Sequence, residues 1–131
     1  MSTPELYISM SELLSVPVVT IAGVMHNAHM PALTAVLAGM AEFGKNSFVF
    51  DVANLDCPGD AEAENVVDLM RTVPSSFKVH LVCSGLPRKL MSKAHLGKRI
   101  MIYATTDEIA RLLHKEWASQ QPLATPTPHP L

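Results

Sequence analysis

Two cysteines are the side chains in this sequence with the most versatile chemistry, because a thiolate can act as a nucleophile, a metal ligand or a redox partner. Cys57 and Cys83 each follow an apolar segment, so both are expected at the same edge of a parallel sheet, where a redox pair is one alternative. No histidine or other base accompanies Cys57 in a recognisable pattern. We therefore predict no catalytic residues and no enzymatic activity, and we interpret both cysteines as small apolar side chains.

His26 and His29 form the second group that could do chemistry, because imidazole nitrogens bind transition metals. A metal site needs at least one further ligand, and no cysteine or acidic residue is near these two in sequence. We therefore predict neither a metal nor a cofactor. The segment 26–29 (His-Asn-Ala-His) is better interpreted as a loop that frames a surface for a partner.

Charged residues are unevenly distributed along the chain. Five of the 12 acidic residues lie between positions 56 and 68, and five of the 10 basic residues lie between 88 and 99. The two runs are Asp56, Asp60, Glu62, Glu64 and Asp68, and Arg88, Lys89, Lys93, Lys98 and Arg99. They are either ordinary solvated faces or surfaces that attract each other, within one chain or between copies.

Composition limits the kind of partner. The formal charge of −2 gives no electrostatic attraction for nucleic acid or for an anionic membrane, and the aromatic content of 5% offers no platform for stacking bases. The chain begins with no basic stretch followed by an apolar core, and its apolar run 16–25 is about half as long as a membrane span. Two cysteines suit a reducing compartment. The sequence thus predicts a cytoplasmic protein that binds no nucleic acid and inserts into no membrane.

Hydrophobic periodicity predicts strands that alternate with helices. Strands are expected at 6–10, 16–22, 47–51, 79–83 and 100–103, and helices are expected to begin near Pro31, Asp60, Gly85 and Thr105. Their buried stripes are expected at Leu33, Val36, Leu37 and Met40; at Ala63, Val66, Val67 and Met70; at Leu90, Met91 and Ala94; and at Ile109, Leu112, Leu113 and Trp117.

Local residues also predict where these helices begin and end. Asp60 is expected to be the N-cap of the second helix, and Thr105 with Glu108 forms a capping-box pattern at the start of the fourth. Gly44 and Gly97 are expected to end the first and third helices.

The order of elements predicts a single α/β domain over residues 1–118, with a mixed, mostly parallel sheet of four to five strands and four helices. Residues 119–131 contain four prolines and almost no core-forming side chain, so they are predicted to be a disordered tail.

Four stretches share the order and spacing of one known family. They are 18–23 (Val-Val-Thr-Ile-Ala-Gly), 48–55 (Phe-Val-Phe-Asp-Val-Ala-Asn-Leu), 79–88 (Val-His-Leu-Val-Cys-Ser-Gly-Leu-Pro-Arg) and 102–110 (Ile-Tyr-Ala-Thr-Thr-Asp-Glu-Ile-Ala). The chain resembles the STAS family, whose best-known members are the anti-sigma factor antagonists of bacteria. The resemblance implies a STAS-like fold and a regulatory, protein-binding role in signalling or transcription, with an anti-sigma factor or a kinase-like ATPase as the partner.

The sequence departs from this family where the family's function is decided. STAS regulators typically carry an Asp-Ser-Ser/Thr-Gly run at the start of the second helix, and a partner kinase phosphorylates one hydroxyl there. Gly59-Asp60-Ala61-Glu62 stands in that place, with Asp60 and Ala61 at the phosphoacceptor position, and no Ser or Thr occurs between Ser47 and Thr72. The phosphoswitch is therefore expected to be absent. Asp60 is interpreted either as an ordinary helix-capping acid or as a partial mimic of a phosphorylated hydroxyl.

The resemblance places a partner-binding surface on the loop before the first helix, the start of the second helix and the third helix. Its predicted residues are His26, Asn27, Cys57, Pro58, Gly59, Asp60, Ala61, Glu62, Glu64 and Arg88. Two alternatives remain open. The chain could be a transporter-associated or ligand-binding STAS subunit, for a lipid, a nucleotide or another small molecule, and it could form a homo-oligomer.

Overall fold

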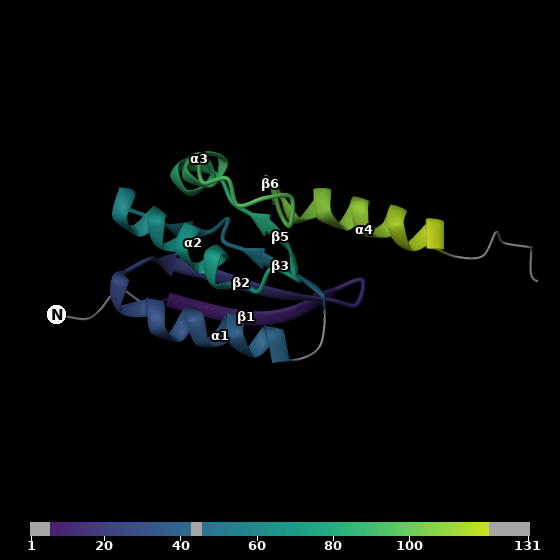
Figure 1. Cartoon of the computed structure of the whole chain (residues 1–131), viewed down its shortest axis with the longest axis horizontal. Helices are drawn as coiled ribbons and strands as arrows, with labels where there is room; N and C mark the ends of the chain where they lie inside the picture. Colours follow the sequence, from purple (N-terminus) through teal and green to yellow (C-terminus); the bar gives the residue numbers. More distant parts are fainter. Residues whose placement is uncertain (1–5, 43–45, 121–131) are drawn as a thin grey trace, which may run out of the picture.

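The fold is organised around one central β-sheet. A computed structural model describes residues 6–42 and 46–120 (Figure 1). Its strands are β1 (Leu6–Leu13), β2 (Val16–Val24), β3 (Ser47–Asp51), β4 (Leu55–Asp56), β5 (Lys78–Val82) and β6 (Ile100–Tyr103). They form one six-stranded sheet in the order β1-β2-β3-β5-β6, with the short β4 beside the end of β2. Only β1 is antiparallel to its neighbour, so the predicted mixed, mostly parallel sheet is confirmed.

Four α-helices connect these strands in the described part of the chain. They are α1 (Met30–Glu42), α2 (Asp60–Thr72), α3 (Gly85–Lys93) and α4 (Thr106–Gln120), and a 3-10 turn (Asn27–His29) leads into α1. All four were predicted within a few residues. Gly44 and residues 121–131 lie outside the described residues, but α4 runs on to Gln120, so the first two residues of the expected tail are helical.

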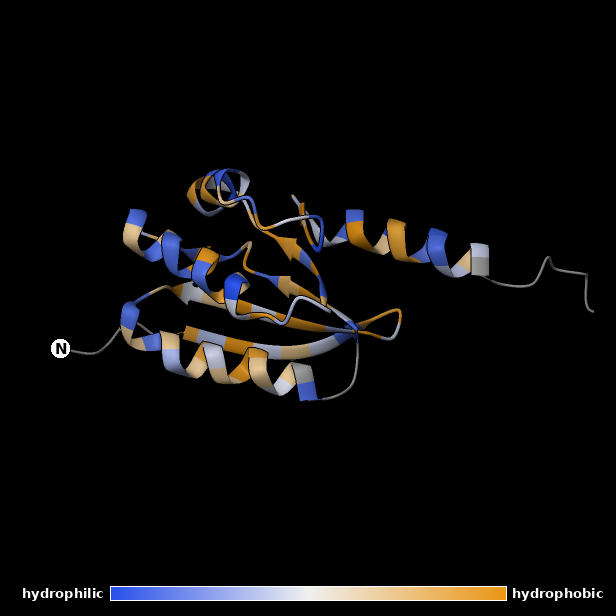
Figure 2. Cartoon of the chain, in the orientation of Figure 1, coloured by the Kyte–Doolittle hydropathy of each residue, from blue (hydrophilic) through white to orange (hydrophobic). Residues whose placement is uncertain are grey.

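Alternation along the strands divides the apolar side chains between two faces of the sheet. Val19, Phe50 and Leu81 represent the first face, which packs against the buried stripes of α1, α2 and α3. Val18 and Val49 represent the second face, and they form a buried cluster with Ile109 and Leu113 of α4. Three helices thus cover one face of the sheet and one helix covers the other, and Figure 2 shows much of the apolar colour on the strands.

Trp117 was predicted to belong to the buried stripe of α4, and that prediction is wrong. Its side chain is 55% exposed, whereas Ile109 is fully buried and Leu113 is 8% exposed. Figure 1 shows α4, in yellow-green, projecting beyond the end of the sheet toward which the β1–β2 turn also points. Because the sheet ends there, the last turns of the helix have no strand to pack on.

His80 on β5 is the one buried polar side chain among the described residues, with 4% of its surface exposed. It points to the α4 face, and its Nδ1 lies 3.3 Å from the hydroxyl of Tyr103 on β6. Burial lowers the pKa of His80, and Lys78 lowers it further, while Glu116 opposes the shift. The folded protein therefore holds His80 in its neutral form more strongly than the unfolded chain does.

This burial predicts a pH dependence of stability. The unfolded chain takes up a proton on His80 near pH 6.5, above the lowered pKa of the folded state, so the contribution of neutral His80 is complete above about pH 6.5 and is lost as the pH falls through the folded pKa. Urea unfolding of the wild type and of His80→Gln between pH 7.5 and 5 measures how the free energy of unfolding depends on pH. We expect a shallower loss of stability in His80→Gln, and the wild-type slope in the exposed control His114→Gln. Identical slopes in all three proteins would contradict the assignment.

Candidate functional site

The predicted partner-binding residues gather at the carboxyl ends of β2, β3 and β5. The short strand β4, which the sequence did not predict, makes this possible by pairing with the end of β2: Gly23 lies opposite Leu55 and Val24 opposite Asp56. The Met25 amide extends the pairing by donating to the Asp56 carbonyl at 2.9 Å. The loop before α1 and the loop before α2 are thereby held side by side.

A side-chain hydrogen bond joins the loop before α1 to helix α2. Asn65 Nδ2 on α2 donates to Asn27 Oδ1 at 2.6 Å. Asn65 was not singled out in the sequence, because nothing in the pattern of α2 distinguishes it from a solvated polar residue. It connects the loop at 26–29 to α2 one helical turn beyond Ala61, so this loop and the start of α2 form one continuous structure.

His26 and His29 serve the backbone of the loop. The Ala28 amide donates to His26 Nδ1 at 3.1 Å, and the His26 amide donates to His29 Nδ1 at 3.2 Å, which together form a capping box around the 3-10 turn. Over residues 6–42 and 46–120, no three side chains of His, Cys, Asp or Glu gather closely enough to hold a metal ion. The structure therefore gives these histidines a local structural role.

The start of α2 differs from the prediction in one respect. The N-cap is Gly59, with an extended backbone (φ −148°), and no side chain caps the helix there. Asp60 is the first helical residue, because the first backbone bond runs from the Ala63 amide to the Gly59 carbonyl at 3.1 Å. The prediction of Asp60 as N-cap is wrong by one position, since its neighbour adopts the non-helical conformation that an N-cap requires.

Acidic side chains still surround this helix start. Asp60 and Glu62 lie in the first turn, where carboxylates interact favourably with the helix dipole. Glu62 folds back toward Gly59, because a Cβ atom placed on Gly59 would lie 3.3 Å from Glu62 Oε2. Asp60, Ala61 and Glu64 are exposed, so a partner can reach the negative charge.

Cys57 and Cys83 are both free thiols. Burial first, then the negative charges of Asp56 and Glu62, raise the pKa of Cys57 to about 11. Burial also raises the pKa of Cys83 to about 11, against the effect of Arg88. A high thiol pKa disfavours the thiolate that nucleophilic and redox chemistry need, so the environment supports the interpretation of both cysteines as apolar side chains.

The basic run lies beside the acidic one without pairing to it. Arg88 is exposed on α3, whereas Arg99 donates to the carbonyls of Val73 (2.9 Å) and Pro74 (3.1 Å) at the end of α2. Arg99 is therefore a structural cap of α2 and no part of a free basic face. Among the described residues, the one ion pair joins Arg71 and Asp68 within α2, at 2.9 Å.

Comparison with known proteins identifies the fold. No family model and no curated protein sequence matches this chain. Among solved structures, it is similar to an anti-sigma factor antagonist from Mycobacterium paratuberculosis, with 17% identity, a TM-score of 0.67, and coverage of 87% of this chain and 99% of that one. It is also similar to a DUF3478-family protein from Shewanella loihica with a SpoIIAA-like fold, with 14% identity, a TM-score of 0.56, and coverage of 86% and 97%.

These similarities span nearly the whole described chain, and they confirm the STAS-like α/β fold that was predicted from the sequence. The protein has a STAS-like, SpoIIAA-like α/β fold. Within the described ranges, no helix is long and apolar enough to cross a membrane.

The hydrogen bond between the two asparagines predicts a measurable coupling. In a double-mutant cycle of Asn27→Ala and Asn65→Ala, the two substitutions should be non-additive by roughly 0.5–1 kcal/mol in the free energy of unfolding. Asn27→Ala combined with Asn54→Ala is the control, because no side-chain bond joins those two residues, and it should be additive. Additivity in both cycles would show that the bond does not hold the loop to α2.

The thiol environments predict low reactivity. With a pKa of about 11, only a few thiols in ten thousand are ionised at pH 7.5, so iodoacetamide should alkylate both cysteines far more slowly than a free cysteine. Cys57 should react before the buried Cys83, and both should react rapidly in urea. Mass spectrometry of tryptic peptides at timed intervals measures the rates. Alkylation of Cys57 at the rate of an unperturbed thiol would refute this assignment.

Proposed function

We propose that this protein is a non-enzymatic regulatory module of the cytoplasm that binds another protein through the edge formed by the 26–29 loop, the 57–64 segment and α3. It differs from a switchable STAS regulator because its binding surface carries a fixed negative charge in place of a phosphorylated hydroxyl. The observation that carries the proposal is the first turn of α2, where Asp60 and Ala61 are exposed and no Ser or Thr is near in sequence; the resemblance to STAS regulators puts the phosphoacceptor position there.

The geometry supports a docking role for this edge. Pro58, Asp60, Ala61 and Glu64 are exposed, and the exposed side chains of His26 and Asn27 lie on the neighbouring loop, which β4 and the Asn65 bond hold in place. A surface that is pre-organised in this way loses little conformational entropy when a partner binds.

Charge supports a partial mimicry of the phosphorylated state. A phosphate carries nearly two negative charges and a carboxylate carries one, so Asp60 supplies part of the charge that phosphorylation would add at a helix start. Glu62 and Glu64 add to the same field. The proposed partner is an anti-sigma factor or a kinase-like ATPase, because the fold is that of the mycobacterial anti-sigma factor antagonist.

The partner can be identified with a crosslinker placed on the proposed surface. A photoreactive residue at the exposed Ala61 should capture one protein from the native lysate, and the same residue at the exposed Ala118 on α4 should not. Affinity of the purified partner should then fall roughly three- to tenfold for Asp60→Asn and stay unchanged for Asp107→Asn. Asp107 is a matched control because it is an exposed acid in the first turn of another helix.

Two outcomes would overturn the proposal. One is equal loss or equal retention of affinity in Asp60→Asn and Asp107→Asn, which would remove the first turn of α2 from the interface. The other is incorporation of phosphate at Thr72 or at Ser84, the exposed N-cap of α3, on incubation with the partner and ATP, read by peptide mass spectrometry, because a hydroxyl phosphorylated there would give the edge a switchable charge.

A further inference from the structure

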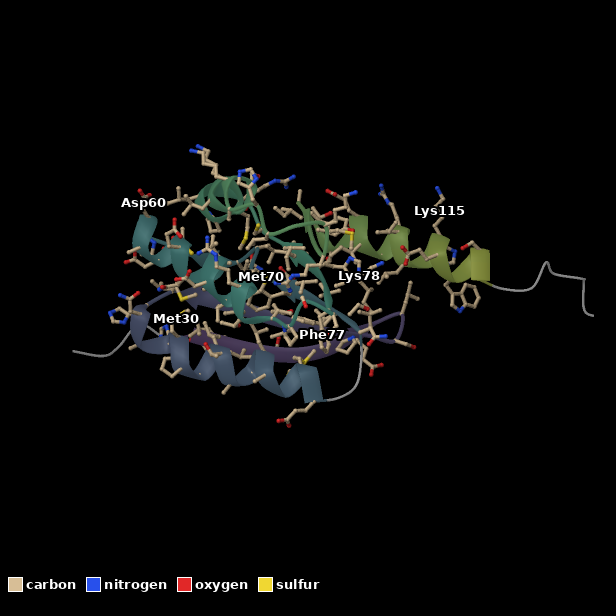
Figure 3. The ribbon with its side chains drawn as sticks, viewed as in Figure 1. Met30, Asp60, Met70, Phe77, Lys78 and Lys115 are labelled. Carbon is tan, nitrogen blue, oxygen red and sulfur yellow. The ribbon has the colours of Figure 1, made fainter. Side chains whose placement is uncertain are left out.

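A groove lies at the end of the sheet opposite to the proposed partner surface. Its volume is about 740 Å³, and it is bordered by the first residues of β2, β3 and β5, by the β1–β2 turn and by the last turns of α4. Figure 3 shows Asp60 and Met30 at one end of the molecule and Lys78 and Lys115 toward the other. A volume in this range is typical of small-molecule sites, which usually occupy roughly 300–1,000 Å³.

His80 supplies a buried polar group to this groove. Its side chain is 4% exposed and lies in the groove lining. Nδ1 is engaged with Tyr103, while Nε2 has no hydrogen-bond partner among the described residues and is not sealed inside the protein. A nearly buried imidazole with one nitrogen left for a ligand is unusual in a simple surface depression, because buried polar atoms are normally satisfied.

Apolar side chains form part of the wall. Trp117 and Leu14 are two of the five large apolar residues that are markedly exposed in the described chain, and both border this groove. Figure 2 shows the apolar colour at the tip of the β1–β2 turn. Leu113, which is buried, and Met101, which is half-buried, also line the groove. An indole beside aliphatic side chains is a surface on which a flat aromatic ring can stack.

The charges in the groove are balanced. Lys78 and Glu116 both line it, and both act electrostatically on His80, so one cation and one anion stand close to the same point. No ion pair within 4 Å joins them to each other or to another described side chain. The hydroxyl and amide groups of Asn46, Ser47 and Ser76 complete a polar side of the lining.

We propose that this groove binds a small aromatic zwitterion, a molecule of the aromatic amino acid class. Its ring stacks on Trp117, its carboxylate pairs with Lys78, and its ammonium group pairs with Glu116, with His80 Nε2 as a further polar contact. Complementary charge favours this class over the alternatives: a nucleotide brings a net negative charge to a groove whose charges cancel, and a long acyl chain would cover six polar lining residues.

Trp117 is the only tryptophan in the chain, so its fluorescence reports directly on the groove. Phenylalanine, which absorbs and emits apart from tryptophan, is the probe. Titration with phenylalanine should give a saturable change in Trp117 emission. Phenylpropionate lacks the ammonium, phenethylamine lacks the carboxylate and leucine lacks the ring, so each should bind roughly fivefold or more weakly.

Substitutions assign the contacts. Lys78→Gln and Glu116→Gln should each weaken phenylalanine binding roughly tenfold and leave the emission of the free protein intact. Both residues are exposed, so the fold should tolerate these changes, which thermal unfolding verifies. Lys115→Gln and Asp107→Asn are the matched controls, because they are exposed charges of α4 outside the groove, and they should bind as the wild type does.

The proposal fails if phenylalanine gives no saturable change up to about 20 mM, a concentration at which even weak specific binding would show. It also fails if Lys78→Gln and Glu116→Gln bind phenylalanine as well as the wild type. Saturable binding of AMP or of a lysophospholipid in place of phenylalanine would assign the groove to a nucleotide or a lipid instead. None of these results bears on the partner surface, which lies at the other ends of the strands.

Discussion

The parallel ladder of β2, β3 and β5 is the constraint on which the rest of this structure depends. Val18, Val49 and His80 lie in register on one face, and the residues that follow them point to the other face. This alternation requires two layers of helix, and the three crossover helices α1, α2 and α3 occupy one face. The fourth helix has the second face to itself. Because α4 covers only part of that face, His80 is buried without being enclosed, and a groove remains beside it.

Much of this architecture could be predicted from sequence, for a physical reason. The apolar stripe of α2 buries one side of that helix, so its spacing indicates a helix directly, and the short apolar run Ser47–Asp51 is typical of a strand that is buried on both faces. The same reasoning gave the wrong prediction for Trp117, which was expected to be buried. Its spacing continues the stripe of α4, but spacing records only the side of a helix on which a residue lies, and whether the sheet extends far enough to cover it depends on strand lengths and register in three dimensions.

The candidate site also has some features that could be predicted from the sequence and others that could not. The acidic start of α2 is a local feature, and the sequence located it within one residue. The bond from Asn65 to Asn27, the pairing of β4 with β2 and the cap that Arg99 places on α2 join residues that are distant in sequence. No periodicity marks such partners, because each of them would be equally acceptable in solvent. The groove could not be predicted for the same reason, since Lys78 and Glu116 come to line one space only through the packing of α4 on the sheet.

The two ends of the sheet therefore impose different physical requirements. At the carboxyl ends of the strands, loops and a helix start expose polar groups on a frame held by β4, an arrangement suited to a protein surface. A carboxylate encoded there cannot be added or removed by a kinase and a phosphatase, so the negative charge at this helix start is set by the sequence. At the amino ends of the strands, α4 extends beyond the sheet. The indole of Trp117, the imidazole of His80 and the opposite charges of Lys78 and Glu116 line one groove there. β2, β3 and β5 each contribute to both ends, as β5 does with Lys78 at its start and Cys83 directly after it, so these strands connect the groove to the edge. Any effect of one site on the other would pass through these strands or the helices packed on them, and the buried centres of the strands leave them little freedom to deform.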